Sequence, residues 1–230
     1  QRQMCIRDSL YASHESLILD YEKLFFKKFK NYQFCCSSHM LWVGDRTRYI
    51  NSEHLDFVSK LDNPIGIKVG PKIKIDDIPL LCSKVNPQNE QGKLIFIVRL
   101  GEKNIEKMLP KIIEKVKYYG HEIIWFCDPM HGNTIKSHNG YKTRQFKTII
   151  NELEAFFNIH MSLNTIPGGV HIELTGENVT ECLGGINDIK DKDLDLRYET
   201  ACDPRLNNEQ SLEIAFLISK LIKQRKNNGR

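Results

Sequence analysis

The stretch EIIWFCDPMHGNT, residues 122–134, joins a run of β-branched and aromatic side chains to a turn that carries Asp128 and His131. The apolar run lacks strict polar alternation, which is typical of a strand buried on both faces of a parallel sheet. Pro129 and Gly132 then mark the turn. A strand that delivers an acid and a histidine at its end predicts a site at the C-terminal edge of such a sheet.

Other short apolar runs share this character and, together with 122–127, predict strands at 34–43, 65–69, 94–99 and 170–174. The amphipathic segments between them predict helices at 15–30, 52–61, 76–84, 104–119, 143–157 and 208–223, with a short one at 177–182. Asn51 or Ser52 is the expected N-cap of the second helix. Alternating strands and helices indicate an α/β fold, either an open doubly wound sheet or a barrel. No Gly-x-Gly-x-x-Gly or Walker loop follows a strand, which argues against a nucleotide-binding open sheet.

Length and composition narrow the class of protein. The chain has 230 residues, of which 40% are hydrophobic, enough for one sizeable core in one domain. The formal net charge is +4 and the Lys and Arg residues are scattered, so we expect no nucleic-acid partner, whereas anionic small molecules fit this charge. Seven cysteines without a C-x-x-C pair predict a reduced, intracellular protein. No apolar run reaches the roughly 18 residues that span a bilayer, so we expect no membrane association.

Three cations arrive at or near the ends of successive predicted strands: Arg46, Lys68 and Arg99. A cation inside an apolar strand is costly to bury unless it is paired. Each could pair with an acid such as Asp45 or Glu173, or could keep its charged head in water. Three convergent cations without matching local acids favour a phosphate or carboxylate site, because guanidinium binds these anions through two parallel hydrogen bonds.

His131, Glu173 and Asp203 offer one nitrogen and two carboxylates from strand ends or the loops after them. That set suits Mn²⁺, Fe²⁺, Co²⁺ or Zn²⁺. Each residue also has a simpler interpretation. His131 could be a hydrogen-bonded loop histidine, Glu173 could neutralise a neighbouring lysine, and Asp203 could fix a turn before the last helix. Spacing does not decide between the alternatives, because the residues come from separate βαβ units.

Several long motifs in a fixed order resemble the class II, plant-type 3-deoxy-D-arabino-heptulosonate 7-phosphate (DAHP) synthases. The motifs are WVGDRTR (42–48), NPIGIKVGPK (63–72), CDPMHGNT (127–134), PGGVHIELTGENVTECLGG (167–185) and CDPRLN (202–207). The resemblance covers roughly residues 10 to 224 and implies a (β/α)8 TIM barrel. The five units identified from the sequence would be about strands 4 to 8, an incomplete barrel.

The same resemblance implies a transferase that condenses phosphoenolpyruvate with erythrose 4-phosphate and water to give DAHP and phosphate. This is the first step of the shikimate pathway, which leads to chorismate and the aromatic amino acids. The family requires a divalent metal, with Mn²⁺ or Co²⁺ expected here. The full-length enzyme is expected to be a homo-oligomer in the cytoplasm, or in the plastid of a plant-like eukaryote.

Residue roles carry over motif by motif. The implied substrate-binding residues are Asp45, Arg46, Lys68 and Arg99. The implied metal ligands are His131, Glu173 and Asp203, and the implied catalytic residues are His131, Lys68 and Glu173. The family's cysteine ligand, on its first barrel strand, has no counterpart among these motifs. Many relatives also have Glu where Asp45 stands.

The expected organisation is a non-native scar at residues 1–9, a partial barrel domain at 10–224 and a disordered tail at 225–230. Because the first strands and the cysteine ligand have no counterpart, we expect the chain alone to have little or no synthase activity. The alternative is a non-catalytic remnant or binding piece of the same barrel.

Overall fold

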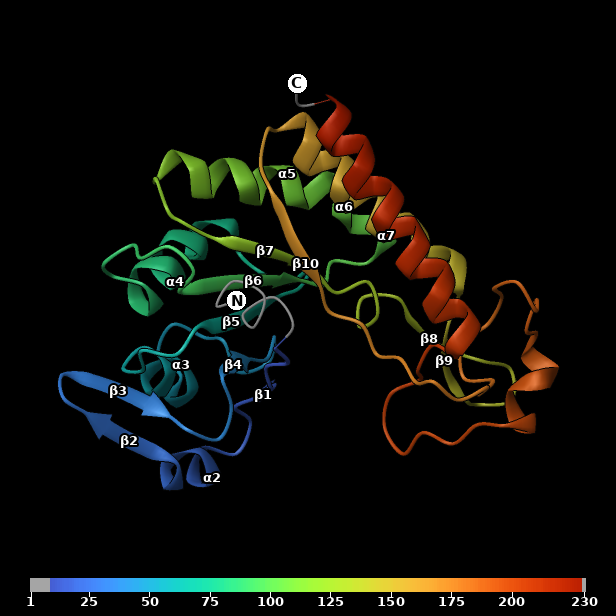
Figure 1. Ribbon diagram of the computed structural model, residues 1–230, viewed down its shortest axis with the longest axis horizontal. Coiled ribbons are helices and arrows are strands. Elements are labelled where there is room, and N and C mark those ends of the chain that lie inside the picture. Colours follow the sequence, from blue (N-terminus) through green and yellow to red (C-terminus); the bar gives the residue numbers. More distant parts are fainter. Residues whose placement is uncertain (1–8, 229–230) are drawn as a thin grey trace. The chain divides into compact units, whose positions relative to one another are not determined.

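The computed structural model describes the backbone of residues 9–228 and the side chains through residue 225 (Figure 1). The expected scar at residues 1–9 and the end of the expected tail, 229–230, therefore lie almost wholly outside the described residues. The chain divides into two compact units. The first unit comprises residues up to 97 together with 114–124, and the second comprises 98–113 together with 125 onward.

The fold is α/β, as predicted, with a six-stranded sheet in the order β1-β4-β5-β6-β7-β10. Its strands are β1 (Ser13–Glu15), β4 (Met40–Val43), β5 (Ile65–Val69), β6 (Leu94–Val98), β7 (Ile124–Cys127) and β10 (Pro167–Val170). The pairs β1–β4, β4–β5 and β7–β10 are parallel. Every residue of β5 and β6 is buried, which explains why these runs lack polar alternation. Closure of the sheet into a barrel stays a prediction.

In the first unit, two helices follow their predicted positions. Helix α3 (Glu53–Val58) begins after Ser52, whose Oγ accepts a hydrogen bond from Leu55 N at 3.1 Å, so Ser52 is the N-cap. The predicted helix at 76–84 is a 3₁₀ turn, η1 (Ile75–Asp77), that continues into α4 (Ile78–Val85).

The predicted helix at 15–30 is wrong. A short helix, α2 (Leu19–Leu24), gives way to an antiparallel hairpin of β2 (Phe26–Phe29) and β3 (Tyr32–Cys35). The predicted strand at 34–43 is likewise divided into β3 and β4. The Asn63 side chain causes this break: its Oδ1 accepts from Cys35 N at 2.9 Å, and its Nδ2 donates to the carbonyls of Cys35 and Ser38. These hydrogen bonds, made by a side chain 25 to 28 residues further along the chain, occupy backbone groups that a continuous strand would pair with its neighbours.

Helix α5 (Glu102–Tyr118) contains Pro110 and ends shortly before Gly120, whose φ is +69°.

In the second unit, residues 143–157 were predicted to be helical, but the chain first forms a hairpin of β8 (Thr134–Lys136) and β9 (Lys142–Arg144). Helix α6 (Phe146–Ser162) follows, then the 3₁₀ turn η2 (Asp191–Leu196). The last helix, α7 (Asn208–Asn228), runs beyond its predicted end at 223 and lies against α6 (Figure 1).

Two predictions for the chain after β7 need correction. The strand predicted at 170–174 is instead β10, at residues 167–170. Leu174, beyond β10, forms an isolated parallel bridge with Leu206. The expected helix at 177–182 is not formed. Glu181, within that segment, is fully buried, and its carboxylate binds backbone and side-chain donors instead.

No helix in the described range is both long and apolar enough to cross a membrane. The cysteines in that range are all free thiols.

Candidate metal centre

Asp128, directly after β7, shapes the turn that carries His131. The Asp128 side chain is fully buried, and its Oδ1 accepts hydrogen bonds from the backbone N–H groups of Met130 and His131, both at 3.1 Å. The Asp128 N–H itself donates to the carbonyl of Val98 at 2.6 Å. A buried carboxylate therefore folds the turn back over the end of the strand.

The same carboxylate orients the imidazole of His131. Nδ1 lies 2.8 Å from Asp128 Oδ2, which leaves Nε2 directed toward two other acids. Nε2 lies 3.0 Å from Glu173 Oε1 and 4.0 Å from Asp203 Oδ2. An acid behind a histidine fixes both the tautomer and the ring orientation that a metal site requires.

Glu173 and Asp203 reach this point because two backbone hydrogen bonds join their segments. Leu206 N donates to the carbonyl of Glu173 at 3.0 Å, and Thr175 N donates to the carbonyl of Leu206 at 2.9 Å. As a result, one ligand atom from each of His131, Glu173 and Asp203 lies within 4.8 Å of the others. The three residues that the sequence suggested are brought together in the second unit.

The loop that holds Asp203 is fixed at both ends by Glu181. The Glu181 carboxylate accepts from Thr200 N at 2.8 Å and from Arg205 N at 2.7 Å, and it also pairs with the Arg205 guanidinium at 2.6 Å. The segment at 177–182 therefore supports the site through a buried acid rather than through a helix N-terminus.

Arg144 lies behind the two carboxylates and has no exposed surface. Its Nη1 donates to Glu173 Oε2 at 2.8 Å, and its Nη2 lies 3.5 Å from Asp203 Oδ1. Lys142, about half exposed, also pairs with Asp203. Two cations therefore stand beside the two acids.

These contacts lower the pKa of both carboxyl groups. Burial is the largest single influence and raises the pKa of Glu173, but hydrogen bonding to His131 and the charge of Arg144 outweigh it. For Asp203, burial again raises the pKa, and the hydrogen bond and charge of Lys142, aided by Arg144, lower it further than burial raises it. Both acids are thus held in the anionic form that binds cations.

A second set of potential ligands, Asp128, His131 and His171, also lies within 4.8 Å. This set fits a metal less well, because Asp128 already binds the turn and the Nδ1 atom of His131. Arg99, at the end of β6, contributes a further cation to the second unit, where its Nη2 donates to the carbonyl of His131 at 2.6 Å.

The other predicted substrate-binding residues belong to the first unit. Asp45 follows β4, and its Oδ1 accepts from Gly70 N at 3.0 Å and from Arg48 Nε at 2.9 Å. Lys68 is buried within β5, with its Nζ 5.9 Å from the centre of the Trp42 ring. Arg46 is exposed. Convergence of these cations with Arg99 stays a prediction.

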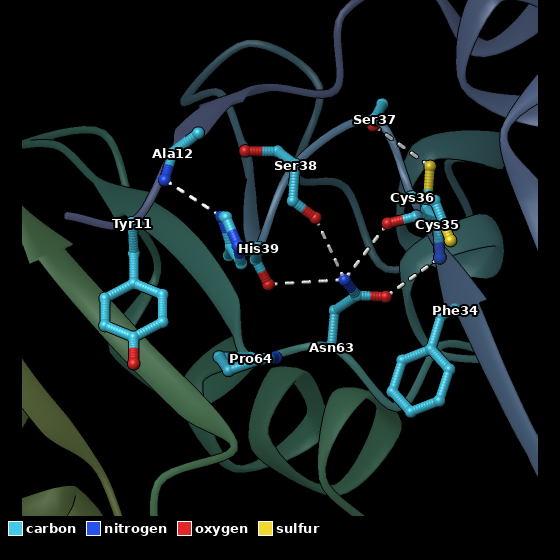
Figure 2. Close-up of a pocket in the computed structure, with 10 residues that line it drawn as sticks. All are labelled: Tyr11, Ala12, Phe34, Cys35, Cys36, Ser37, Ser38, His39, Asn63 and Pro64. Atoms are coloured by element: carbon cyan, nitrogen blue, oxygen red, sulfur yellow. Dashed lines mark hydrogen bonds between the residues drawn. The ribbon is translucent and has the colours of Figure 1, made fainter. Parts of the chain in front are cut away.

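The first unit also contains a cavity of about 580 Å³, lined by residues 11–12, 34–39 and 63–64 (Figure 2). In Figure 2 the Asn63 side chain lies among the backbone groups of this wall, where its amide makes the hydrogen bonds that separate β3 from β4. None of the described residues that line the cavity is Asp, Glu, Lys or Arg, so it does not match the predicted anion site.

Sequence reasoning missed Arg144 and the orienting role of Asp128. The role of Arg144 was not predicted, because residues 143–157 were assigned to a helix. The Asn139-Gly140 pair was the available signal, since this dipeptide is typical of a tight hairpin turn. Asp128 was noted at the strand end, but its position three residues before His131 did not reveal which partner it binds.

Comparison with known proteins agrees with the motif resemblance. The family model described as the class-II DAHP synthetase family matches residues 1–219. The chain is 48% identical over 221 residues to the phospho-2-dehydro-3-deoxyheptonate aldolase AroG of Mycolicibacterium smegmatis, an alignment covering 93% of the chain and 48% of that protein. It is 46% identical over 213 residues to the phospho-2-dehydro-3-deoxyheptonate aldolase of Streptomyces coelicolor, covering 92% and 47% respectively.

The chain thus spans about half the length of the curated relatives it matches. Both relatives are bacterial, so they lend no support to a plastid location. The extent of the family match and the identity to two named relatives confirm the resemblance seen in the motifs, and the chain belongs to the class-II DAHP synthetase family.

Proposed function

We propose that this chain supplies the metal centre and part of the substrate site of a DAHP synthase. The reaction joins phosphoenolpyruvate to erythrose 4-phosphate, with addition of water and loss of phosphate. The observation that carries the proposal is the cluster of His131, Glu173 and Asp203, with ligand atoms within 4.8 Å of one another, in a chain of this family.

The donor set fits a divalent ion. One imidazole nitrogen and two carboxylates suit Mn²⁺ or Co²⁺. When bound, such an ion acts as a Lewis acid toward the aldehyde oxygen of erythrose 4-phosphate. His131, Glu173 and Asp203 would hold it, with Asp128 orienting His131 through the 2.8 Å contact at Nδ1.

The remaining residues bind and orient the anionic substrates. Arg99 lies beside the His131 turn, and its guanidinium suits the carboxylate or phosphate of phosphoenolpyruvate. Lys68, Arg46 and Asp45 complete the substrate site as the motifs imply. Held together, the two reactants meet in the geometry that carbon–carbon bond formation requires, which is catalysis chiefly by positioning and electrostatics. Lys68, His131 and Glu173 are the residues we assign to catalysis.

This function implies small-molecule substrates and no nucleic-acid or membrane partner. It also implies a cytoplasmic, homo-oligomeric enzyme built on a closed barrel, to which this chain contributes about strands 4 to 8. The chain alone is expected to release little or no phosphate from the two substrates.

The first test is Mn²⁺ binding by the 230-residue chain, measured by calorimetry. We expect binding by the unmodified chain and none by His131→Ala. The metal site is refuted if the unmodified chain binds no Mn²⁺, or if the variant binds it equally well.

A chimera tests the activity. The matched half of the Mycolicibacterium smegmatis relative is replaced by this chain, and phosphate release and DAHP formation are measured. We expect turnover by the chimera and none by its His131→Ala form. A folded, Mn²⁺-binding chimera without turnover would favour the alternative, a non-catalytic piece of the same barrel.

A further inference from the structure

Arg144 contacts the segment of every proposed metal ligand. Its side chain is fully buried at the end of β9, where an unpaired charge would be prohibitively costly. We propose that Arg144 is a positioning residue that preassembles the metal centre by fixing which oxygen of each carboxylate faces His131. This inference rests on the proposed function of the site.

The first contacts hold the turn that carries His131. Arg144 Nε donates to the carbonyl of Met130 at 2.8 Å and lies 3.2 Å from Thr134 Oγ1. These two acceptors stand on either side of His131 in the chain. The guanidinium therefore fixes the backbone from which the imidazole projects.

The second contacts place Arg144 on one oxygen of each carboxylate, and in Asp203 that oxygen also pairs with Lys142. Glu173 Oε2 accepts from Arg144 Nη1 at 2.8 Å, while Glu173 Oε1 lies 3.0 Å from His131 Nε2. In Asp203, Oδ1 faces Arg144 Nη2 at 3.5 Å, while Oδ2 is the oxygen nearer to His131. Nη1 also donates to the carbonyl of Pro204, next to Asp203. Each acid thus turns one oxygen to Arg144 and presents the other to the imidazole.

Only arginine can make this set of contacts. The planar guanidinium has five N–H donors in a rigid fork, whereas lysine carries three donors on a single nitrogen. A lysine at position 144 would keep the charge but could not reach Met130, Glu173 and Pro204 together. Position 144 therefore allows charge and geometry to be separated by experiment.

Charge and positioning predict opposite results. As a nearby positive charge, Arg144 repels a bound cation, so its removal would strengthen metal binding. If Arg144 instead positions the ligands, it strengthens metal binding, and its removal weakens metal binding. We expect both Arg144→Met and Arg144→Lys to bind Mn²⁺ about 10- to 100-fold more weakly than the unmodified chain. Equal or tighter binding by Arg144→Met overturns the proposal, and so does wild-type affinity in Arg144→Lys.

Two control variants separate positioning from loss of stability. Leu153→Ala removes a fully buried apolar side chain of α6, and should lower the melting temperature while leaving Mn²⁺ affinity within about twofold. Arg197→Met removes an arginine that is 41% exposed and pairs with Glu177 and Glu199, and should change neither. Equal loss of affinity in Leu153→Ala and Arg144→Lys at matched stability would assign the effect to folding and overturn the proposal.

A measurement on the unmodified chain covers the case in which the Arg144 variants do not fold. The Nε–H resonance of Arg144 is followed by NMR while Zn²⁺, a diamagnetic ion, is added. We expect the signal to persist with slow exchange, because the contact to Met130 is kept when the ion binds. Its disappearance on saturation with Zn²⁺ would overturn the proposal.

The outcomes also distinguish this inference from the proposed function. If the unmodified chain binds neither Mn²⁺ nor Zn²⁺, the metal site fails and the role of Arg144 fails with it. If it binds the ions, and Arg144→Met binds them as well or better, only the role of Arg144 fails.

Discussion

Gly132 packs its backbone against Gly101 so closely that a Cβ added to Gly101 would lie 2.7 Å from the carbonyl oxygen of Gly132. Gly101 also has φ +79°, a region that disfavours other residues. The Glu152 carboxyl group bridges the same two turns, accepting from Gly101 N at 2.8 Å and from Asn133 Nδ2 at 2.6 Å. The close packing of the two glycines and the hydrogen bonds of Glu152 hold the start of α5 against the turn that carries His131.

Gly132→Ala should disrupt the packing between these two turns, because the new Cβ would overlap the backbone of Gly101. We expect a loss of stability of about 1–3 kcal/mol in chemical denaturation, together with weaker Mn²⁺ binding. Gly176→Ala is the matched control, since a Cβ there meets nothing within 4 Å. Equal stability of the two variants would contradict the close packing.

Asp128→Asn should weaken Mn²⁺ binding by about 10- to 100-fold, because the amide cannot support the imidazole as the carboxylate does at 2.8 Å. Its oxygen can still accept from the turn N–H groups, so the melting temperature should fall less than in Gly132→Ala. Asp20→Asn, at a side chain that is 95% exposed, serves as the control in calorimetry. Unchanged affinity in Asp128→Asn would show that the acid shapes the turn only.

His160 should make the protein sensitive to acid. Burial, aided by the charge of Arg225, lowers the pKa of His160 from 6.5 to about 4. The unfolded chain then binds more protons than the folded one between these values, so stability falls as pH drops from 6.5 toward 4, by on the order of 3 kcal/mol. His160→Phe cannot titrate and should flatten this part of the curve in urea denaturation. An unchanged slope in the variant would exclude His160 as its source.

Glu152 should act in the opposite direction at higher pH. Burial, with a contribution from the charge of Asp128, raises the pKa of Glu152 to about 8, against the hydrogen bonds from Gly101 and Asn133. The folded state then retains a proton that the unfolded chain releases above about 4.5, so stability declines as pH rises from there to about 8. Glu152→Gln carries no charge and should lessen the decline between about pH 4.5 and pH 8. A decline of equal size would contradict the raised pKa.

The sequence was most informative where burial decides the structure. The apolar runs that became β5 and β6 were located almost to the residue, because strands buried on both faces need continuous apolar side chains. His131 and Glu173 followed from the rule that parallel strands present their ends at one edge. Asn51 or Ser52 was expected as an N-cap because few side chains can accept from the first turn, and the structure shows that it is Ser52.

Prediction failed where single polar contacts decide the structure. Helix 15–30 was expected, yet the chain turns at Lys30, which has φ +55°, a conformation that lysine seldom adopts. The separation of β3 from β4 depends on Asn63, about 25 residues further along the chain. Arg144 binds acceptors up to 60 residues away, so its role could not be seen in any local pattern.

The two compact units divide the proposed chemistry unequally. His131, Glu173, Asp203 and Arg144 all belong to the second, whereas Asp45, Arg46 and Lys68 belong to the first. Arg99, a further proposed anion ligand, lies in the second unit, so only substitutions at Asp45, Arg46 and Lys68 can change anion binding without altering the unit that holds the proposed metal ligands. A change in substrate preference therefore need not alter the residues that would bind the metal.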